Sequence, residues 1–152
     1  NHYLKKDFAD FLIDQRRFQE ALEVLGDMVS DNDSILLALL ASKGADRTDD
    51  VRRLRQQLAA RLEENRLRGN KPHGRIEPRY LLYVEHDPLK GLQVALANWA
   101  EQKEIRDSRN VLEAAIAAKR KEEVTAVVQF LQRHKTEDVA LKRLLDQWSE
   151  LP

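Results

Sequence analysis

Apolar residues recur at helical spacing from the start of the chain. Residues 3–14 place large side chains three and four positions apart, at Tyr3, Leu4, Phe8, Phe11 and Leu12. Residues 18–29 repeat this spacing with Phe18, Ala21, Leu22, Leu25 and Met28. Such spacing is typical of amphipathic helices. Because only a few polar residues around Arg16 and Arg17 separate the two stretches, the pattern predicts an antiparallel helical hairpin with a solvent-exposed charged turn.

The pattern continues through the first half of the chain. "DNDSILLALLASKGA" begins with Asp and Ser residues that can cap a helix and ends near Gly44, a candidate stop. Thr48 is the expected N-cap of a long helix that reaches about residue 68, with an apolar stripe of Val51, Leu54, Leu58 and Leu62. The Gly- and Pro-rich stretch "RGNKPHGRIEP" then predicts a loop between two subarrays of helices, at about 1–68 and 75–152.

The second half predicts five more helices. A short helix over 77–86 carries Tyr80, Leu81, Tyr83 and Val84, and Asp87 and Pro88 favour the start of the next helix. That helix presents Leu92, Ala95, Leu96 and Trp99. A further pair is expected at about 107–119 and 121–133, and residues 136–138 open a last helix with Leu141, Leu144, Leu145 and Trp148 on one side. The sequence therefore predicts an all-α chain of nine helices, with a C-terminal capping helix.

Composition narrows the chemistry. Charged residues make up 34% of the 152, and the 26 basic and 26 acidic side chains cancel, so nothing attracts nucleic acid or an anionic membrane to the chain as a whole. The absence of cysteine excludes disulfides and thiolate chemistry. The longest apolar run, "SILLALLAS", is too short to cross a bilayer, and we expect no membrane insertion. The start without methionine suggests a fragment of a longer, soluble protein of the cytoplasm or the bacterial periplasm.

No motif predicts an enzyme. There is no G-x-S-x-G and no glycine-rich phosphate loop. His2, His73, His86 and His134 stand apart without metal-ligand spacing. Adjacent carboxylates such as Glu63 and Glu64 point about 100 degrees apart on a helix and do not converge on one substrate. We expect no catalytic residues, no cofactor and no metal.

"RRFQEALEVL" resembles the second half of a tetratricopeptide repeat. Phe18, Ala21 and Leu25 fill its aromatic, small and large positions, and the preceding helix offers Phe8, Ala9 and Leu12. Weaker matches follow at Leu37, Leu40, Ala41, Gly91, Ala95, Leu112, Ala115 and Val128, with departures at Pro78, Arg79 and Val124. The whole looks like the degenerate C-terminal part of a bacterial tetratricopeptide protein of unassigned activity. The resemblance implies one domain over 1–152, a right-handed solenoid of stacked hairpins.

The resemblance also implies a binding face. In the register of the repeat, six side chains line the concave groove: Lys6, Asp10, Tyr80, Tyr83, Arg109 and Glu113. Asp10 stands where members that grip a peptide's terminal carboxylate have asparagine, so that specificity is not implied here. The leading hypothesis is a non-catalytic scaffold that docks a peptide or folded protein on this face. Its oligomeric state is left open.

A local excess of positive charge supports a second hypothesis. Residues 47–79 hold ten cations: Arg47, Arg52, Arg53, Arg55, Arg61, Arg66, Arg68, Lys71, Arg75 and Arg79. They could bind RNA or another anionic partner. They could equally be a solvated helix face whose arginine stems cover apolar surface, since no aromatic series accompanies them. A third hypothesis is a purely structural end of a longer solenoid.

Overall fold

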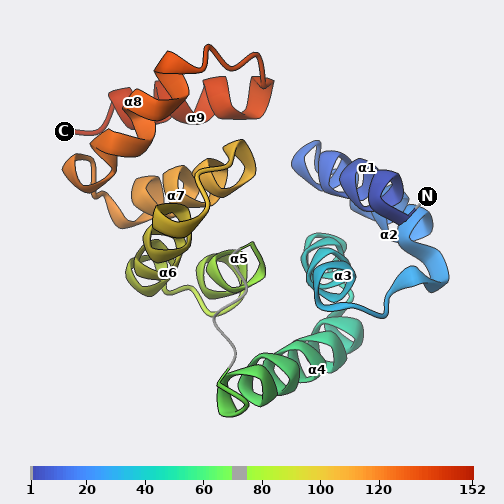
Figure 1. Cartoon of the computed structure of the whole chain (residues 1–152). Helices are drawn as coiled ribbons and strands as arrows, with labels where there is room; N and C mark the ends of the chain where they lie inside the picture. The colour runs from blue at the N-terminus through green and yellow to red at the C-terminus, as the bar shows by residue number, and fades with distance from the viewer. Residues whose placement is uncertain (1, 70–74) are drawn as a thin grey trace. The chain divides into compact units, whose positions relative to one another are not determined.

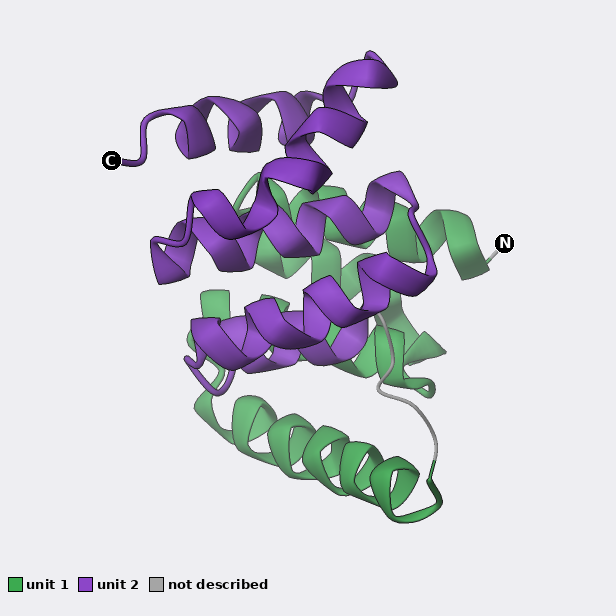
Figure 2. Ribbon diagram, turned by 60° about the vertical axis from the view of Figure 1, so that its left-hand side comes forward, with its two compact units in different colours: residues 1–71 green, residues 72–152 purple. Residues whose placement is uncertain are grey.

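The computed structural model describes residues 2–69 and 75–152, and within them the fold is all helical (Figure 1). The chain divides into two compact units, Asn1–Lys71 and Pro72–Pro152 (Figure 2). Described helices of the first unit are α1 (His2–Asp14), α2 (Phe18–Leu25), α3 (Asn32–Gly44) and α4 (Thr48–Leu67). Those of the second are α5 (Ile76–Tyr83), α6 (Pro88–Glu101), α7 (Ile105–Ala118), α8 (Thr125–Arg133) and α9 (Val139–Ser149). The predicted nine α-helices without a strand are confirmed for this part of the chain.

Helix α3 forms the centre of the first unit. It is buried almost all round its axis from Ser34 to Leu39 and again at Ala41 and Ser42, and it packs against α1, α2 and α4. A helix that is apolar on every side must be enclosed in this way. Its start is fixed by Asp31, whose carboxylate accepts from the Ser34 backbone N–H at 2.7 Å while the Ser34 hydroxyl completes a capping box. The predicted cap at this end is confirmed.

Helix α7 plays the same part in the second unit. It contacts α5, α6, α8 and α9, and its buried residues include Val111, Leu112, Ala114 and Ala115. Around it lie apolar side chains from the other four helices: Leu82, Leu92, Ala95, Trp99, Val127, Val128, Leu131, Leu141 and Leu144. The predicted caps Asp87 and Asp138 accept from the backbone of Lys90 and Leu141 at 3.1 and 3.0 Å.

Three hairpins share one turn geometry. Arg16, Asp46 and Lys119 adopt left-handed φ values of 57–59° just after α1, α3 and α7. The next backbone N–H, of Arg17, Arg47 or Arg120, donates to a carbonyl five residues earlier at 2.8–2.9 Å, as in a Schellman motif. Each of these arginines then pairs with the acid three residues later, Glu20, Asp50 or Glu123. The repeated turn confirms the predicted charged break at residues 16 and 17.

Two predicted helix ends are wrong. Gly44 is the last residue of α3 and not its left-handed stop, because Asp46 takes that role. Gly44 is small for another reason: a Cβ atom there would lie 2.5 Å from ring carbons of Phe18. Thr48 is the first residue of α4, while Arg47 occupies the N-cap without a capping side chain. A polar turn residue thus ends each helix where sequence reasoning sought glycine or threonine.

The crossing residues of the hairpins agree with the predicted spacing. Ala9 and Ala21 are fully buried on α1 and α2. A Cβ atom on Gly91 of α6 would lie 3.3 Å from the carbonyl oxygen of Pro78 on α5, so the two backbones approach closely. Val124, where the repeat favours a small residue, is fully buried in a short 3-10 turn (Glu122–Val124) that precedes α8. Helix α2 is shorter than predicted, because Gly26 leaves the helix with φ +47° and residues 26–28 form another 3-10 turn.

Candidate functional site

Three of the six predicted groove residues lie together in the second unit. The Tyr83 hydroxyl on α5 donates to Glu113 Oε2 at 2.5 Å, and Arg109 Nε donates to Glu113 Oε1 at 2.8 Å. Arg109 and Glu113 are neighbours on α7, with side chains 23% and 9% exposed. Burial, and then the charge of Glu113, raises the pKa of Tyr83 well above its ordinary value, so the phenol stays protonated and donates. These contacts join α5 to α7.

Tyr80 lies elsewhere on α5. Its side chain is buried, and its hydroxyl donates to Glu85 Oε1 at 2.5 Å just beyond the helix end. The spacing of Tyr80 and Tyr83 therefore places the two rings in different surroundings. Tyr80 offers little surface for a partner, and its main contribution is to the packing of α5.

Lys6 and Asp10 belong to the first unit. Lys6 Nζ lies 3.0 Å from Asp31 Oδ2 and 3.6 Å from Asp33 Oδ2, so it ties α1 to the start of α3. Although partial burial opposes its charge, the hydrogen bond and charge of Asp31 raise the pKa of Lys6. Asp10 is half-buried on the same helix. The predicted six residues are thus divided between the two units, with four of them on α5 and α7.

Most cations of the basic segment have partners nearby. Within α4 and at its ends, ion pairs link Arg47 and Arg53 with Asp50, Arg52 with Asp49, Arg66 with Glu63 and Arg68 with Glu64. Arg75 lies 3.7 Å from Glu104, and Arg61 donates to the Ser30 carbonyl at 2.8 Å. Lys71 lies outside the described residues. These pairings offset much of the local positive charge and favour the solvated-face interpretation of the segment.

A buried polar row on α7 escaped sequence reasoning. Asp107, Ser108 and Asn110 are buried, and Ser108 Oγ accepts from the Trp99 indole at 3.2 Å. Asp107 Oδ1 accepts from Asn98 at 3.1 Å, whereas its Oδ2 is buried without a hydrogen-bond partner. Burial raises the pKa of Asp107, and the charge of Arg75 acts in the opposite direction. The row polarises the helix–helix contact, because buried groups of this kind fix the pairing of α6 with α7.

Helix α1 carries an exposed apolar face. Of the apolar stripe predicted to be buried, only Leu12 is, and the other four side chains remain 49–77% exposed: Tyr3, Leu4, Phe8 and Phe11. The prediction of a single buried stripe is therefore wrong for these four. The rings of Phe8 and Phe11 stack on each other with centroids 6.4 Å apart. Large apolar side chains gathered on one helix face mark interaction surfaces in soluble domains. We call these four residues the α1 face.

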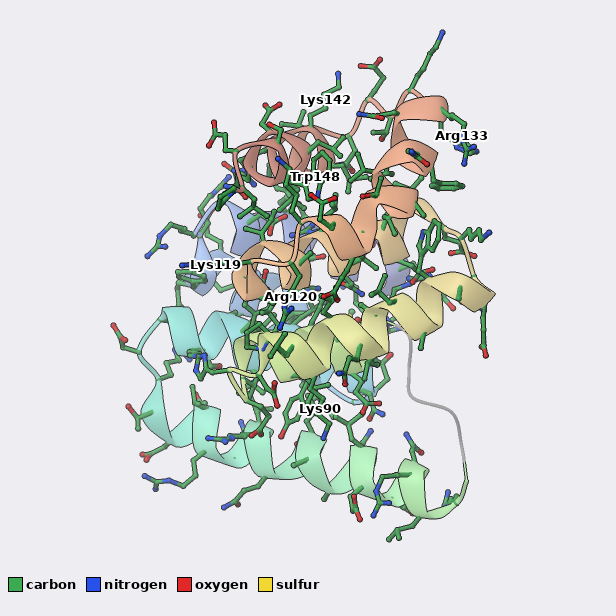
Figure 3. The ribbon with its side chains drawn as sticks, turned by 90° about the vertical axis from the view of Figure 1, so that its left-hand side faces the viewer. Lys90, Lys119, Arg120, Arg133, Lys142 and Trp148 are labelled. Carbon is green, nitrogen blue, oxygen red and sulfur yellow. The ribbon has the colours of Figure 1, made fainter. Side chains whose placement is uncertain are left out.

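Cations of the second unit are spread over several helices (Figure 3). Lys119 and Arg120 lie on the turn after α7, Arg133 at the end of α8 and Lys142 on α9. Arg120 pairs with Glu123 and Lys142 with Glu137. Lys121, on the same turn, donates to the carbonyls of Ser149 and Leu151 and holds the end of α9. These positions do not define an anion site.

Chemical sites of other kinds are missing from the described ranges, 2–69 and 75–152. These ranges contain no group of three or more His, Asp or Glu side chains placed to hold a metal ion. Nor does any of their helices have the length and apolar character needed to span a membrane. Compared with protein-family models, with curated proteins and with solved structures, the chain finds no match. Functional inference therefore depends on the surface itself.

Proposed function

We propose that this chain is a non-catalytic protein-interaction module, built of tetratricopeptide-like hairpins, that docks another protein on the α1 face. The carrying observation is the exposure of Tyr3, Leu4, Phe8 and Phe11 on one helix. Four large side chains left in water on a single helix are a cost to the isolated protein, at about 25 cal/mol per Å² of apolar surface. A partner that covers them recovers this free energy.

The support of the α1 face suits it to binding. Ala9 and Leu12 are buried on the opposite side of α1, and Lys6 ties the helix to Asp31 and Asp33 at the start of α3. The helix is therefore held before a partner arrives. A rigid surface loses little conformational entropy on binding, which favours affinity.

The repeated turn supports the tetratricopeptide-like assignment. Three hairpins end their first helix with a left-handed polar residue and then an arginine paired with an acid. Hairpins of one design are expected when a chain is built from repeats that stack on neighbours. The groove residues Tyr83, Arg109 and Glu113 are a second candidate surface, although Glu113 already accepts from the other two.

The test compares captured partners. The full chain is immobilised and exposed to extract from its source, beside Phe8→Gln/Phe11→Gln and a control, Ile105→Gln/Val139→Gln. The control removes two exposed apolar side chains from the second unit. We expect a protein that binds the parent and the control, and that is lost with the Phe8/Phe11 variant at unchanged helicity. Equal capture by all three proteins would contradict the proposal.

A nucleic-acid arm separates the main alternative. If RNA is captured, its binding should fall steeply with added salt and should depend on the basic segment. Arg52→Ala/Arg55→Ala removes two exposed cations from α4 without touching α1. Loss of all bound material with this variant alone would place the site on α4 and not on α1.

A further inference from the structure

The α1 face has an acidic border. Asp7, Asp10 and Asp14 follow one another at spacings of three and four on α1, so they form one row along the helix. On the helical projection this row adjoins Tyr3 and Phe11, whereas the buried Ala9 and Leu12 lie on the far side. Asp7 is exposed, and Asp10 and Asp14 are half-buried. The apolar face is therefore flanked along one side by three carboxylates.

The placement of this row runs against the electrostatics of the helix. Asp14 is the last residue of α1, and the last turn contains no basic residue. The C-terminus of a helix carries partial negative charge and favours cations, typically by about 0.3–1 kcal/mol. A carboxylate at this end is stabilised when another molecule brings a positive charge to it. Local choices that weaken the isolated fold are expected at functional positions.

We propose that the partner docked on the α1 face is an amphipathic helix whose apolar stripe is bordered by lysine or arginine. Its apolar side chains cover Leu4, Phe8 and Phe11, and its cations lie along Asp7, Asp10 and Asp14. Cations spaced three and four residues apart on the partner match the spacing of the three carboxylates. This inference rests on the proposed function, since it names the chemistry of the molecule that the α1 face binds.

The charge pattern sets specificity more than affinity. Ion pairs at a rim contribute modestly to affinity, whereas like charges placed opposite each other exclude a wrong partner. An acidic amphipathic helix with the same apolar stripe would bring its carboxylates against those of α1. The α1 face therefore distinguishes basic from acidic helices of equal hydrophobicity.

Two synthetic peptides test the proposal with the full chain. One is an 18-residue helix with a leucine stripe and lysines along its border, and the other carries glutamate in place of every lysine. We expect the lysine peptide to bind in a titration by fluorescence anisotropy and the glutamate peptide to bind at least about tenfold more weakly. Equal binding of the two peptides would overturn the proposal.

Matched variants locate the charge effect. Asp7→Asn/Asp10→Asn/Asp14→Asn should weaken the lysine peptide about tenfold. Asp27→Asn/Asp46→Asn/Asp49→Asn removes the same net charge elsewhere in the first unit and should leave binding unchanged. Equal weakening by the two sets would show general attraction and overturn the inference. Dimerisation of the chain alone in sedimentation, lost with Phe8→Gln/Phe11→Gln, would also overturn it, because a second copy would then cover the face.

Failure of the two proposals gives different results. If Phe8→Gln/Phe11→Gln abolishes the binding of both peptides equally and the carboxylate variants bind as the parent does, docking on the α1 face stands and its preference for basic helices falls. If the Phe8/Phe11 variant binds the lysine peptide as the parent does, the α1 face is not the docking site, and the proposed function falls with it.

Discussion

The phenol of Tyr83 donates a 2.5 Å hydrogen bond to Glu113, thirty residues further along the chain. Glu113 accepts from Arg109 as well, so its carboxylate is held between α5 and α7. Side chains that satisfy each other inside a unit contribute to its stability before they contribute to binding. This relationship moves attention from the predicted groove to α1, where apolar side chains of the same size remain in water.

Removal of the Tyr83 hydroxyl should destabilise the second unit. Tyr83→Phe leaves the ring in place but takes a donor from a mostly buried carboxylate, and hydrogen bonds to charged groups contribute about 1.5–3 kcal/mol. Chemical denaturation should show a loss of that size, whereas Tyr3→Phe, at an exposed position, should show almost none. An unchanged midpoint for Tyr83→Phe would contradict the inferred role of the Tyr83–Glu113 bond.

Gly44 and Phe18 should behave as a coupled pair. Alanine at position 44 would meet the Phe18 ring, and overpacking of this kind costs about 1–3 kcal/mol. In a Phe18→Leu background the obstruction is reduced, and the better helix propensity of alanine, about 1 kcal/mol at most, should show. The double-mutant cycle should therefore give a positive coupling energy. Additive effects would mean that Gly44 is not constrained by the ring.

Lys121 should hold the C-terminal helix. Its ammonium donates to the carbonyls of Ser149 and Leu151 at 3.1 and 2.9 Å and lies 5.3 Å from the centre of the Trp148 ring, whose indole N–H donates to the Lys121 carbonyl. Lys121→Met removes the cation from the end of α9, at a cost of about 1–2 kcal/mol. Faster hydrogen exchange should follow in the last turn of α9.

The matched control for Lys121 is Lys119→Met on the same turn. Its exposed side chain lies at the left-handed position after α7, and Figure 3 shows it beside Arg120. Exchange in α9 should be unchanged by this variant. If both substitutions accelerated exchange equally, general loss of positive charge would explain the effect and the contacts of Lys121 would not.

Asp107 should make stability depend on pH. Its pKa is raised above the ordinary value of about 3.9, so the folded protein binds the proton more tightly than the unfolded chain does. This contribution to stability is fully present below pH 3.9 and is lost as the pH rises through the folded pKa. Asp107→Asn removes it, so the free energy of unfolding of the variant relative to the parent should be higher at pH 7 than at pH 4. The same difference at both pH values would contradict the shift.

Sequence patterns predicted the helices and several of their starts. Apolar spacing and the caps Asp31, Asp87 and Asp138 depend on residues close in sequence, and such local signals can be read without a structure. The helix stops were missed because Asp46 and its equivalents adopt a left-handed conformation that glycine ordinarily takes. Hydrogen bonds of the surrounding turn hold these residues there, and no residue type announces them.

The candidate site was harder to predict, for a reason visible in α1. Tyr3, Leu4, Phe8 and Phe11 cover one side of the helix, while Ala9 and Leu12 cover the other. Apolar residues on both sides leave periodicity unable to decide which side faces the core. The smaller pair is buried because α2 and α3 pack against that side, and this choice depends on tertiary contacts. The exposed aromatic residues become visible as a surface only after the fold is known.

The central claim is that α1 is the docking surface, and chemical-shift mapping tests it most directly. The backbone amides of the 15N-labelled chain are followed by NMR while the lysine-bordered peptide is added. The account predicts that the largest shift changes occur at Leu4, Asp7, Phe8 and Phe11, and that they vanish with Phe8→Gln/Phe11→Gln. Changes confined to Arg52 and Arg55 on α4, or to Tyr83 and Arg109 in the second unit, would contradict it.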